Sequence, residues 1–135
     1  MSDPTGRTLA AVRQGDVNLL ALPGREWGLL LGPDNVAARN LTLGYAIFPS
    51  GSAPAGHVHP VEEEMIYVLS GRGRLIAPDI VVELQPGVAV YIPSGVEHAT
   101  VAGDGEPLQL ITVFSPPVVP GSYETQRTTG TEAGE

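Results

Sequence analysis

The sequence predicts one all-β domain built from short antiparallel strands. From residue 17 onward the chain is a series of apolar runs of strand length, nearly all separated by Gly, Pro, Asn or Asp. No stretch shows the helical spacing of apolar residues over three turns. Short apolar runs punctuated by turn residues are typical of a sandwich or barrel of antiparallel strands.

The chain divides into three parts by composition. Residues 1–16 are polar, contain Pro4, Gly6 and Gly15, and are interpreted as a loose N-terminal segment. The expected domain covers residues 17–120, and its strands are predicted at residues 17–22, 27–31, 41–48, 65–69, 74–77, 80–84, 88–92, 99–102 and 108–114. The polar tail at residues 121–135 is expected to be mobile.

Glycine and proline positions support the boundaries between these strands. Pro86 followed by Gly87 predicts a type II turn, because that turn needs a positive φ at its third residue. Gly95 gives the same freedom to the turn that precedes the last histidine. Gly71 and Gly73 lie where the strand at 65–69 must bend or form a bulge.

Composition excludes several function classes. The 135 residues include no Cys, which excludes disulfides and thiol nucleophiles. The 7 basic residues are all Arg, which excludes a Schiff base on lysine. A net charge of −8 argues against nucleic acid as a partner. No apolar run is long enough to span a membrane and the chain does not open as a signal peptide, so we expect a cytoplasmic protein.

The 3 histidines of the chain predict a metal site. His57 and His59 are two positions apart, so on a β-strand both imidazoles would lie on the same face. His98 follows the predicted turn at Gly95 and would bring a third imidazole from another part of the chain. Imidazoles arranged in this way can bind one metal ion together.

The fourth ligand would come from three adjacent acidic residues, Glu62, Glu63 and Glu64. Steps of two along the following apolar run place Glu64 with Ile66 on one face and Glu63 with Met65 on the other. Both faces are apolar, so the alternation alone does not choose among the carboxylates.

Two motifs in this region carry a resemblance to a known family. The pattern Gly-x5-His-x-His-x4-Glu-x6-Gly is met by Gly51, His57, His59, Glu64 and Gly71. The pattern Gly-x5-Pro-x-Gly-x2-His is met by Gly87, Pro93, Gly95 and His98. Together, in this order, they resemble the two motifs of the cupin superfamily.

The resemblance implies a double-stranded β-helix, or jelly-roll barrel, and one divalent metal ion bound by His57, His59, Glu64 and His98. It selects Glu64 as the carboxylate and leaves Glu62 and Glu63 at the rim or in solvent. It also implies a homodimer. The apolar residues on both faces of 65–69 favour association, because one face would be exposed in a monomer.

The ligand set indicates a function class without naming a substrate. Three imidazoles and one carboxylate suit Fe, Mn, Ni, Co, Cu or Zn. An octahedral metal would keep two positions for a small molecule with adjacent oxygens, such as a 2-oxo acid, a dicarbonyl, a catechol or a sugar acid. We therefore expect a metal-dependent enzyme, with dioxygenase-type oxidoreductase chemistry ahead of isomerase, decarboxylase or lyase chemistry. A non-catalytic metal-binding or ligand-binding module is the alternative.

The sequence identifies no catalytic residue. Without further His or Cys, proton transfer is left to Glu63, a tyrosine or bound water. A structural role in the core, at an interface or at a strand edge is expected for Tyr45, Tyr67, Tyr91, Arg72 and Arg74. Trp27 and Phe48 are interpreted as packing residues rather than pocket walls.

Overall fold

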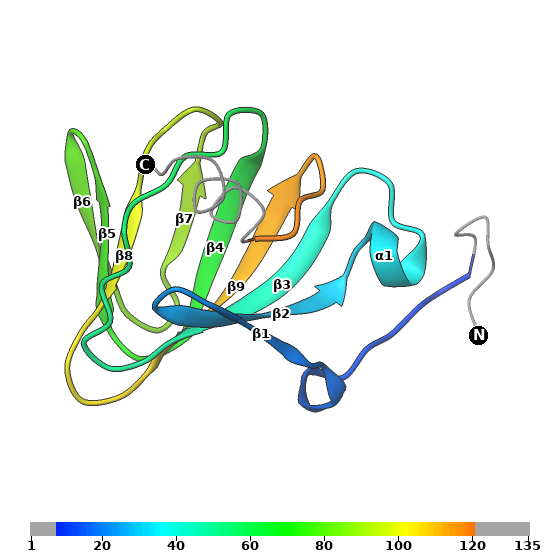
Figure 1. Cartoon of the computed structure of the whole chain (residues 1–135), viewed down its shortest axis with the longest axis horizontal. Helices are drawn as coiled ribbons and strands as arrows, with labels where there is room; N and C mark the ends of the chain where they lie inside the picture. Colours follow the sequence, from blue (N-terminus) through cyan, green and yellow to red (C-terminus); the bar gives the residue numbers. More distant parts are fainter. Residues whose placement is uncertain (1–7, 121–135) are drawn as a thin grey trace.

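A computed structural model describes residues 8–120 of the chain (Figure 1). Residues 1–7 of the predicted N-terminal segment and the predicted mobile tail at 121–135 lie outside the described residues. The rest of the N-terminal segment is exposed and includes one short 3-10 turn, η1 (Gln14–Asp16). In the described part of the chain, no helix has the length and apolar character needed to cross a membrane.

Two antiparallel sheets form a jelly-roll barrel, which confirms the predicted fold class. The 6-stranded sheet has the order β1-β2-β3-β9-β4-β7 and the 3-stranded sheet the order β6-β5-β8. The larger sheet contains β1 (Leu19–Leu22), β2 (Arg25–Leu31), β3 (Thr42–Phe48), β9 (Leu108–Ser115), β4 (Glu63–Ser70) and β7 (Ala89–Ile92). The smaller sheet contains β6 (Ile80–Leu84), β5 (Gly73–Ala77) and β8 (Ala99–Ala102), and lies on the left in Figure 1.

Each predicted apolar run overlaps one of these strands. Strands β2 and β4 begin two residues before their runs, at Arg25 and Glu63, because backbone pairing continues past the apolar residues. Arg25 pairs with Leu22 and Glu63 pairs with Ser115. A one-turn helix that was not predicted, α1 (Pro33–Val36), connects β2 to β3.

The core lies between the two sheets and is built by alternation along the strands. Every second residue of β4 and β9 is buried, as expected for strands with one face on the interior. The buried cluster includes Val68 and Leu108, both with 0% exposure, and reaches the smaller sheet through Leu75, Leu84 and Ala102. This interior holds the candidate site at one end of the barrel.

The predicted turn glycines adopt the backbone conformations that only glycine reaches easily. Gly87 has φ +94° and Gly95 has φ +81°. The amide of Val88 donates to the carbonyl of Gln85 over 3.1 Å, which closes the predicted turn around Gly87. Gly71 has φ +84° at the end of β4, where a bend was predicted.

The predicted homodimer stays a prediction, and the outer face of β4 and β7 shows where to test it. Met65, Tyr67 and Tyr91 are 55%, 47% and 52% exposed, and Met65 pairs directly with Tyr91. Exposed apolar side chains on adjacent strands favour association. We expect light scattering to give the mass of two chains and the Tyr67→Glu variant to shift towards one. A monomeric wild type at micromolar concentration would contradict the prediction.

Candidate metal centre

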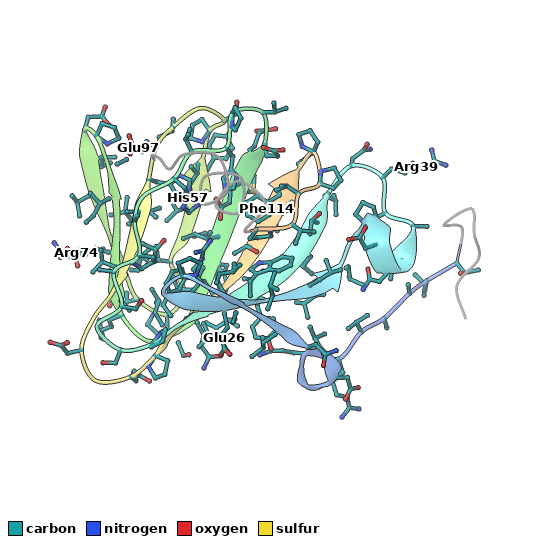
Figure 2. The ribbon with its side chains drawn as sticks, in the orientation of Figure 1. Glu26, Arg39, His57, Arg74, Glu97 and Phe114 are labelled. Carbon is teal, nitrogen blue, oxygen red and sulfur yellow. The ribbon has the colours of Figure 1, made fainter. Side chains whose placement is uncertain are left out.

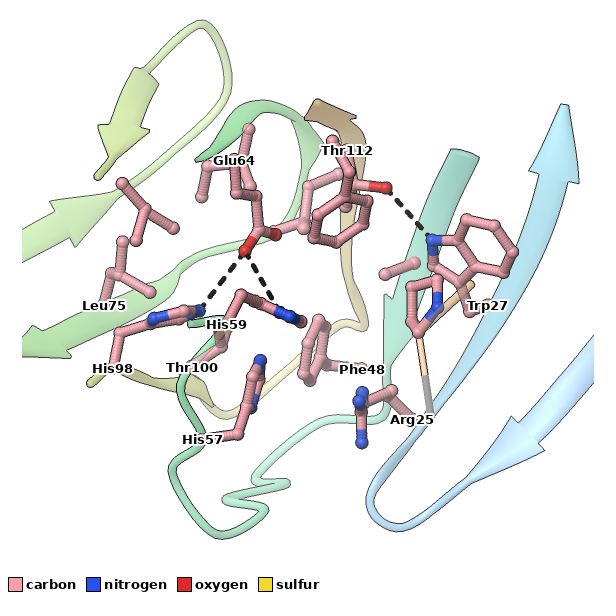
Figure 3. A pocket seen from close by; sticks show the side chains of 16 residues that line it. Arg25, Trp27, Phe48, His57, His59, Glu64, Leu75, His98, Thr100 and Thr112 are labelled. Carbon is pink, nitrogen blue, oxygen red and sulfur yellow. Dashed lines mark hydrogen bonds and ion pairs between the residues drawn. The ribbon is translucent and has the colours of Figure 1, made fainter. Parts of the chain in front are cut away.

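The four predicted ligand residues come together at one place in the barrel. The candidate ligand atoms of His57, His59, Glu64 and His98 all lie within 4.8 Å of one another. Three of these residues are buried and His57 is half-buried. Figure 3 shows the three imidazoles and the carboxylate facing one another. The group is therefore able to hold a metal ion.

Backbone pairing between distant segments positions the histidines. His57 and His98 form an isolated antiparallel bridge, with N–H···O distances of 2.9 and 3.0 Å. The amide of Gly95 donates to the carbonyl of His59 over 2.8 Å. The assumed strand through both His57 and His59 is wrong, because only His57 is paired in this way and His59 belongs to a loop. The two imidazoles still converge, with ring centroids 5.0 Å apart.

Pairing of β4 within the large sheet decides which carboxylate enters the barrel. Glu64 is 7% exposed and shares the buried face with Ile66, whereas Glu63 lies on the exposed face. The hydroxyl of Tyr91 donates to Glu63 Oε1 over 2.6 Å on that outer face, so neither residue is placed to transfer protons inside the pocket. Glu62 was expected at the rim or in solvent but is only 8% exposed.

The cluster contains buried polar atoms that a cation would satisfy. Glu64 Oε1 lies 3.3 Å from His98 Nε2 and 3.8 Å from His59 Nε2. Neither Glu64 Oε1 nor His98 Nε2 has a hydrogen-bond partner among the described residues, although both are buried. Buried polar atoms without partners are costly and call for a ligand, an ion or water. Nitrogen and carboxylate donors at this spacing fit a divalent transition metal.

Hydrogen bonding and a neighbouring charge determine the orientation and the pKa of the His98 imidazole. Its Nδ1 lies 2.9 Å from the carbonyl oxygen of Val96, an arrangement that lets Nδ1–H donate and turns Nε2 towards Glu64. Burial alone would lower the pKa of this imidazole. The neighbouring Glu64 carboxylate and the Val96 carbonyl outweigh burial and raise the pKa above its ordinary value.

Metal affinity is expected to fall as the pH is lowered, because an imidazole must lose its proton before it can bind a metal. The raised pKa of His98 means that protons compete with the metal at higher pH than for an ordinary histidine, which titrates near 6.5. Titration with Zn²⁺ between about pH 8 and about pH 5 measures the effect. A constant affinity over this range would contradict the expectation.

A narrow pocket opens beside the cluster. Its volume is about 40 Å³. Buried aromatic residues form part of its wall, and they include Trp27 and Phe48. These two belong to the core, as interpreted, but they line the pocket as well. The indole Nε1 of Trp27 donates to Thr112 Oγ1 over 3.0 Å and fixes the ring in the wall.

Sequence reasoning missed three polar residues of the pocket, Arg25, Thr100 and Thr112. Arg25 and Thr100 are half-buried, as is His57, so these three residues form the rim above a buried floor. The signal for Arg25 was its position two residues before Trp27, which places both side chains on one strand face.

The tyrosines and arginines that were interpreted as structural do not line this pocket. Tyr67, Tyr91, Arg72 and Arg74 are exposed, and Tyr45 is buried elsewhere. Arg72 Nη1 donates to Gln85 Oε1 over 2.7 Å at the surface.

Comparison with known proteins agrees with the fold and the motifs. The cupin-domain family matches residues 44–114, just over half of the chain. Dimethylsulfoniopropionate lyase DddW of Ruegeria pomeroyi is 36% identical over 78 residues, which cover 58% of this chain and 51% of DddW. The chain therefore spans only about half the length of this relative.

Two solved structures share the barrel. The polyketide cyclase RemF from Streptomyces resistomycificus superposes with a TM-score of 0.69 at 27% identity, covering 90% of this chain and 94% of RemF. KdgF from Halomonas sp. superposes with a TM-score of 0.69 at 21% identity, covering 79% of this chain and 94% of KdgF. The second likeness shows the fold alone.

Proposed function

Because the chain belongs to the cupin family, we propose that it is a metal-dependent enzyme acting on a small molecule with adjacent oxygen donors. One observation carries the proposal. His57, His59, Glu64 and His98 converge in a pocket that is open to small molecules and otherwise largely apolar. A divalent ion held by these four residues would supply Lewis-acid activation of a substrate oxygen.

The side chains of the pocket orient the substrate and exclude water. The inner part of the pocket is lined by apolar side chains, which include Trp27, Phe48 and Phe114. Polar interactions between a substrate and the protein are stronger in such surroundings than in water. Outside the cluster, the polar groups among the described lining side chains belong to Arg25, Thr100, Thr112 and the indole of Trp27, and none of these is a carboxylate, an imidazole or a phenol. Proton transfer is therefore left to residues of the cluster or to solvent.

The size of the pocket limits what enters it. Pockets that enclose a drug-sized ligand measure roughly 300–1,000 Å³, so a cavity of about 40 Å³ admits only a small group. Only the coordinating end of a substrate fits beside the cluster, and the remainder must lie at the rim. This arrangement favours small acids and dicarbonyl compounds over bulky ligands.

Two reaction classes follow from different observations. The ligand set and the resemblance in the motifs favour dioxygenase-type chemistry. The similarity to DddW, which is named a lyase, and to RemF, which is named a cyclase, favours a reaction that needs no dioxygen. Such a reaction is the second candidate.

A single assay series separates these classes. Protein loaded with Fe²⁺ would be incubated with 2-oxo acids, dicarbonyls, catechols and sugar acids, with and without dioxygen, and followed by oxygen uptake and product analysis. Uptake coupled to product supports the dioxygenase, and turnover without oxygen supports the second candidate. The His98→Ala variant should be inactive in either case. Metal binding without any turnover would contradict an enzymatic role and favour a binding module.

A further inference from the structure

The rim of the pocket contains a guanidinium group, that of Arg25. Arg25 is the only Lys or Arg among the described lining residues, and it begins strand β2. In Figure 3 its guanidinium lies beside Phe48 on the side of the pocket where His57 stands. Its positive charge is notable in a chain whose net charge is −8.

Contacts of Gly24, the residue before Arg25, hold this turn against the loop that leads to His57. Arg25 Nη1 donates to the carbonyl of Pro23 over 3.0 Å, which anchors the guanidinium on its own turn. Gly24, at φ +72°, packs so closely on this loop that a Cβ there would lie 2.8 Å from Pro54. The hydroxyl of Ser52 donates to the Gly24 carbonyl. The arginine is thus positioned relative to the cluster by the fold.

From this geometry we infer that Arg25 binds a carboxylate of the substrate, so that the protein selects acids whose second polar end coordinates at the cluster. The inference rests on the proposed function. A guanidinium is planar and binds carboxylates through two parallel N–H···O bonds. Because the pocket floor admits only the coordinating end, a carboxylate further along the ligand reaches the rim, where Arg25 lies.

Matched hydroxamates test this assignment. Acetohydroxamate offers a metal-coordinating end without a carboxylate, and the monohydroxamates of malonic, succinic and glutaric acid add a carboxylate at increasing distance. Binding to Co²⁺-loaded protein would be followed through the visible absorption of the metal. A hydrogen bond to a charged group contributes about 1.5–3 kcal/mol, so at least one carboxylate-bearing probe should bind roughly tenfold to 100-fold more tightly than acetohydroxamate.

Variants separate recognition from structure. The Arg25→Gln protein should bind cobalt and acetohydroxamate like the wild type but lose the preference for the carboxylate. The Arg25→Lys protein should keep part of the preference for the carboxylate, because its side chain retains the positive charge but lacks the planar guanidinium. The Arg39→Gln control should behave like the wild type, because Arg39 is exposed near α1, away from His57 in Figure 2.

Two results would overturn the inference. One is equal affinity of the wild type for acetohydroxamate and for every carboxylate-bearing probe. The other is an equal loss of affinity for both kinds of probe in Arg25→Gln, which would assign Arg25 a structural role. Failure of the proposed function would look different, because cobalt content would then be the same in wild type and in His98→Ala. In that event, succinate binding to the metal-free protein should still be weaker in Arg25→Gln, and equal binding would reject the assignment.

Discussion

Replacement of His98 or His57 by alanine is expected to remove most of the bound metal while leaving the barrel folded. Each substitution deletes one of four ligands whose donor atoms lie within 4.8 Å of one another. Loss of a group that merely orients a ligand lowers metal affinity by about 10-fold to 100-fold, so loss of a ligand should cost at least roughly 100-fold. Metal analysis of purified protein and titration with Zn²⁺ measure the effect, and circular dichroism reports the fold.

The adjacent glutamates provide a matched control for this experiment. Glu64→Ala should lose metal, because this carboxylate is buried beside His98 and His59. Glu63→Ala should retain it, since Glu63 lies on the outer face and accepts a hydrogen bond from Tyr91. The choice of carboxylate is wrong if Glu63→Ala loses its metal and Glu64→Ala keeps it. Wild-type metal content in all the histidine variants would reject the site itself.

Gly71→Ala is expected to destabilise the fold more than any surface substitution. Gly71 adopts φ +84°, a region that costs other residues about 1–3 kcal/mol. A Cβ at this position would also overlap the backbone carbonyl of Pro107, which is held in place next to β9 and cannot move away as a side chain could. The two effects together predict a loss of about 3–5 kcal/mol in the free energy of unfolding.

Gly87→Ala separates the two contributions. Gly87 also has a positive φ, +94°, but a Cβ there would meet nothing within 4 Å. Its replacement should therefore cost only the conformational term, about 1–3 kcal/mol. Urea denaturation of the two variants gives the difference directly. Equal destabilisation would show that the close approach of Gly71 to Pro107 contributes nothing.

Local sequence was enough to predict the strands and the turns, and the resemblance in the two motifs named the four residues of the cluster. Each apolar run became a strand because its residues favour extended backbone and the Gly and Pro residues between the runs favour turns. Gly87 and Gly95 took the positive φ that the turn patterns require. His57, His59 and His98 were recognisable because all the histidines of the chain fall at motif positions.

Backbone pairing explains several of the details that the sequence did not predict. The same-face argument for His57 and His59 supposed a strand through both residues, whereas the segment is a loop held by the bridge between His57 and His98 and by the hydrogen bond from the Gly95 amide to the His59 carbonyl. The starts of β2 and β4 were missed because their first residues are charged and are held in the sheet by pairing with Leu22 and Ser115. Apolar side chains predict which residues are buried, whereas backbone pairing also includes polar residues in a strand.

By itself the sequence determined an antiparallel all-β chain, because turn chemistry and strand period are local properties. Its two motifs named three histidines and Glu64 as candidate ligands through the family resemblance. Only the tertiary structure decided which apolar face of β4 lies inside. That choice depends on the pairing of β4 with β9 and β7 and on the smaller sheet, which covers the inner face. It places Glu64 in the cluster and Glu63 on the exposed face. Tertiary structure also brought Arg25 to the rim, through the contacts of the Gly24 turn with Ser52 and Pro54, residues far from it in sequence.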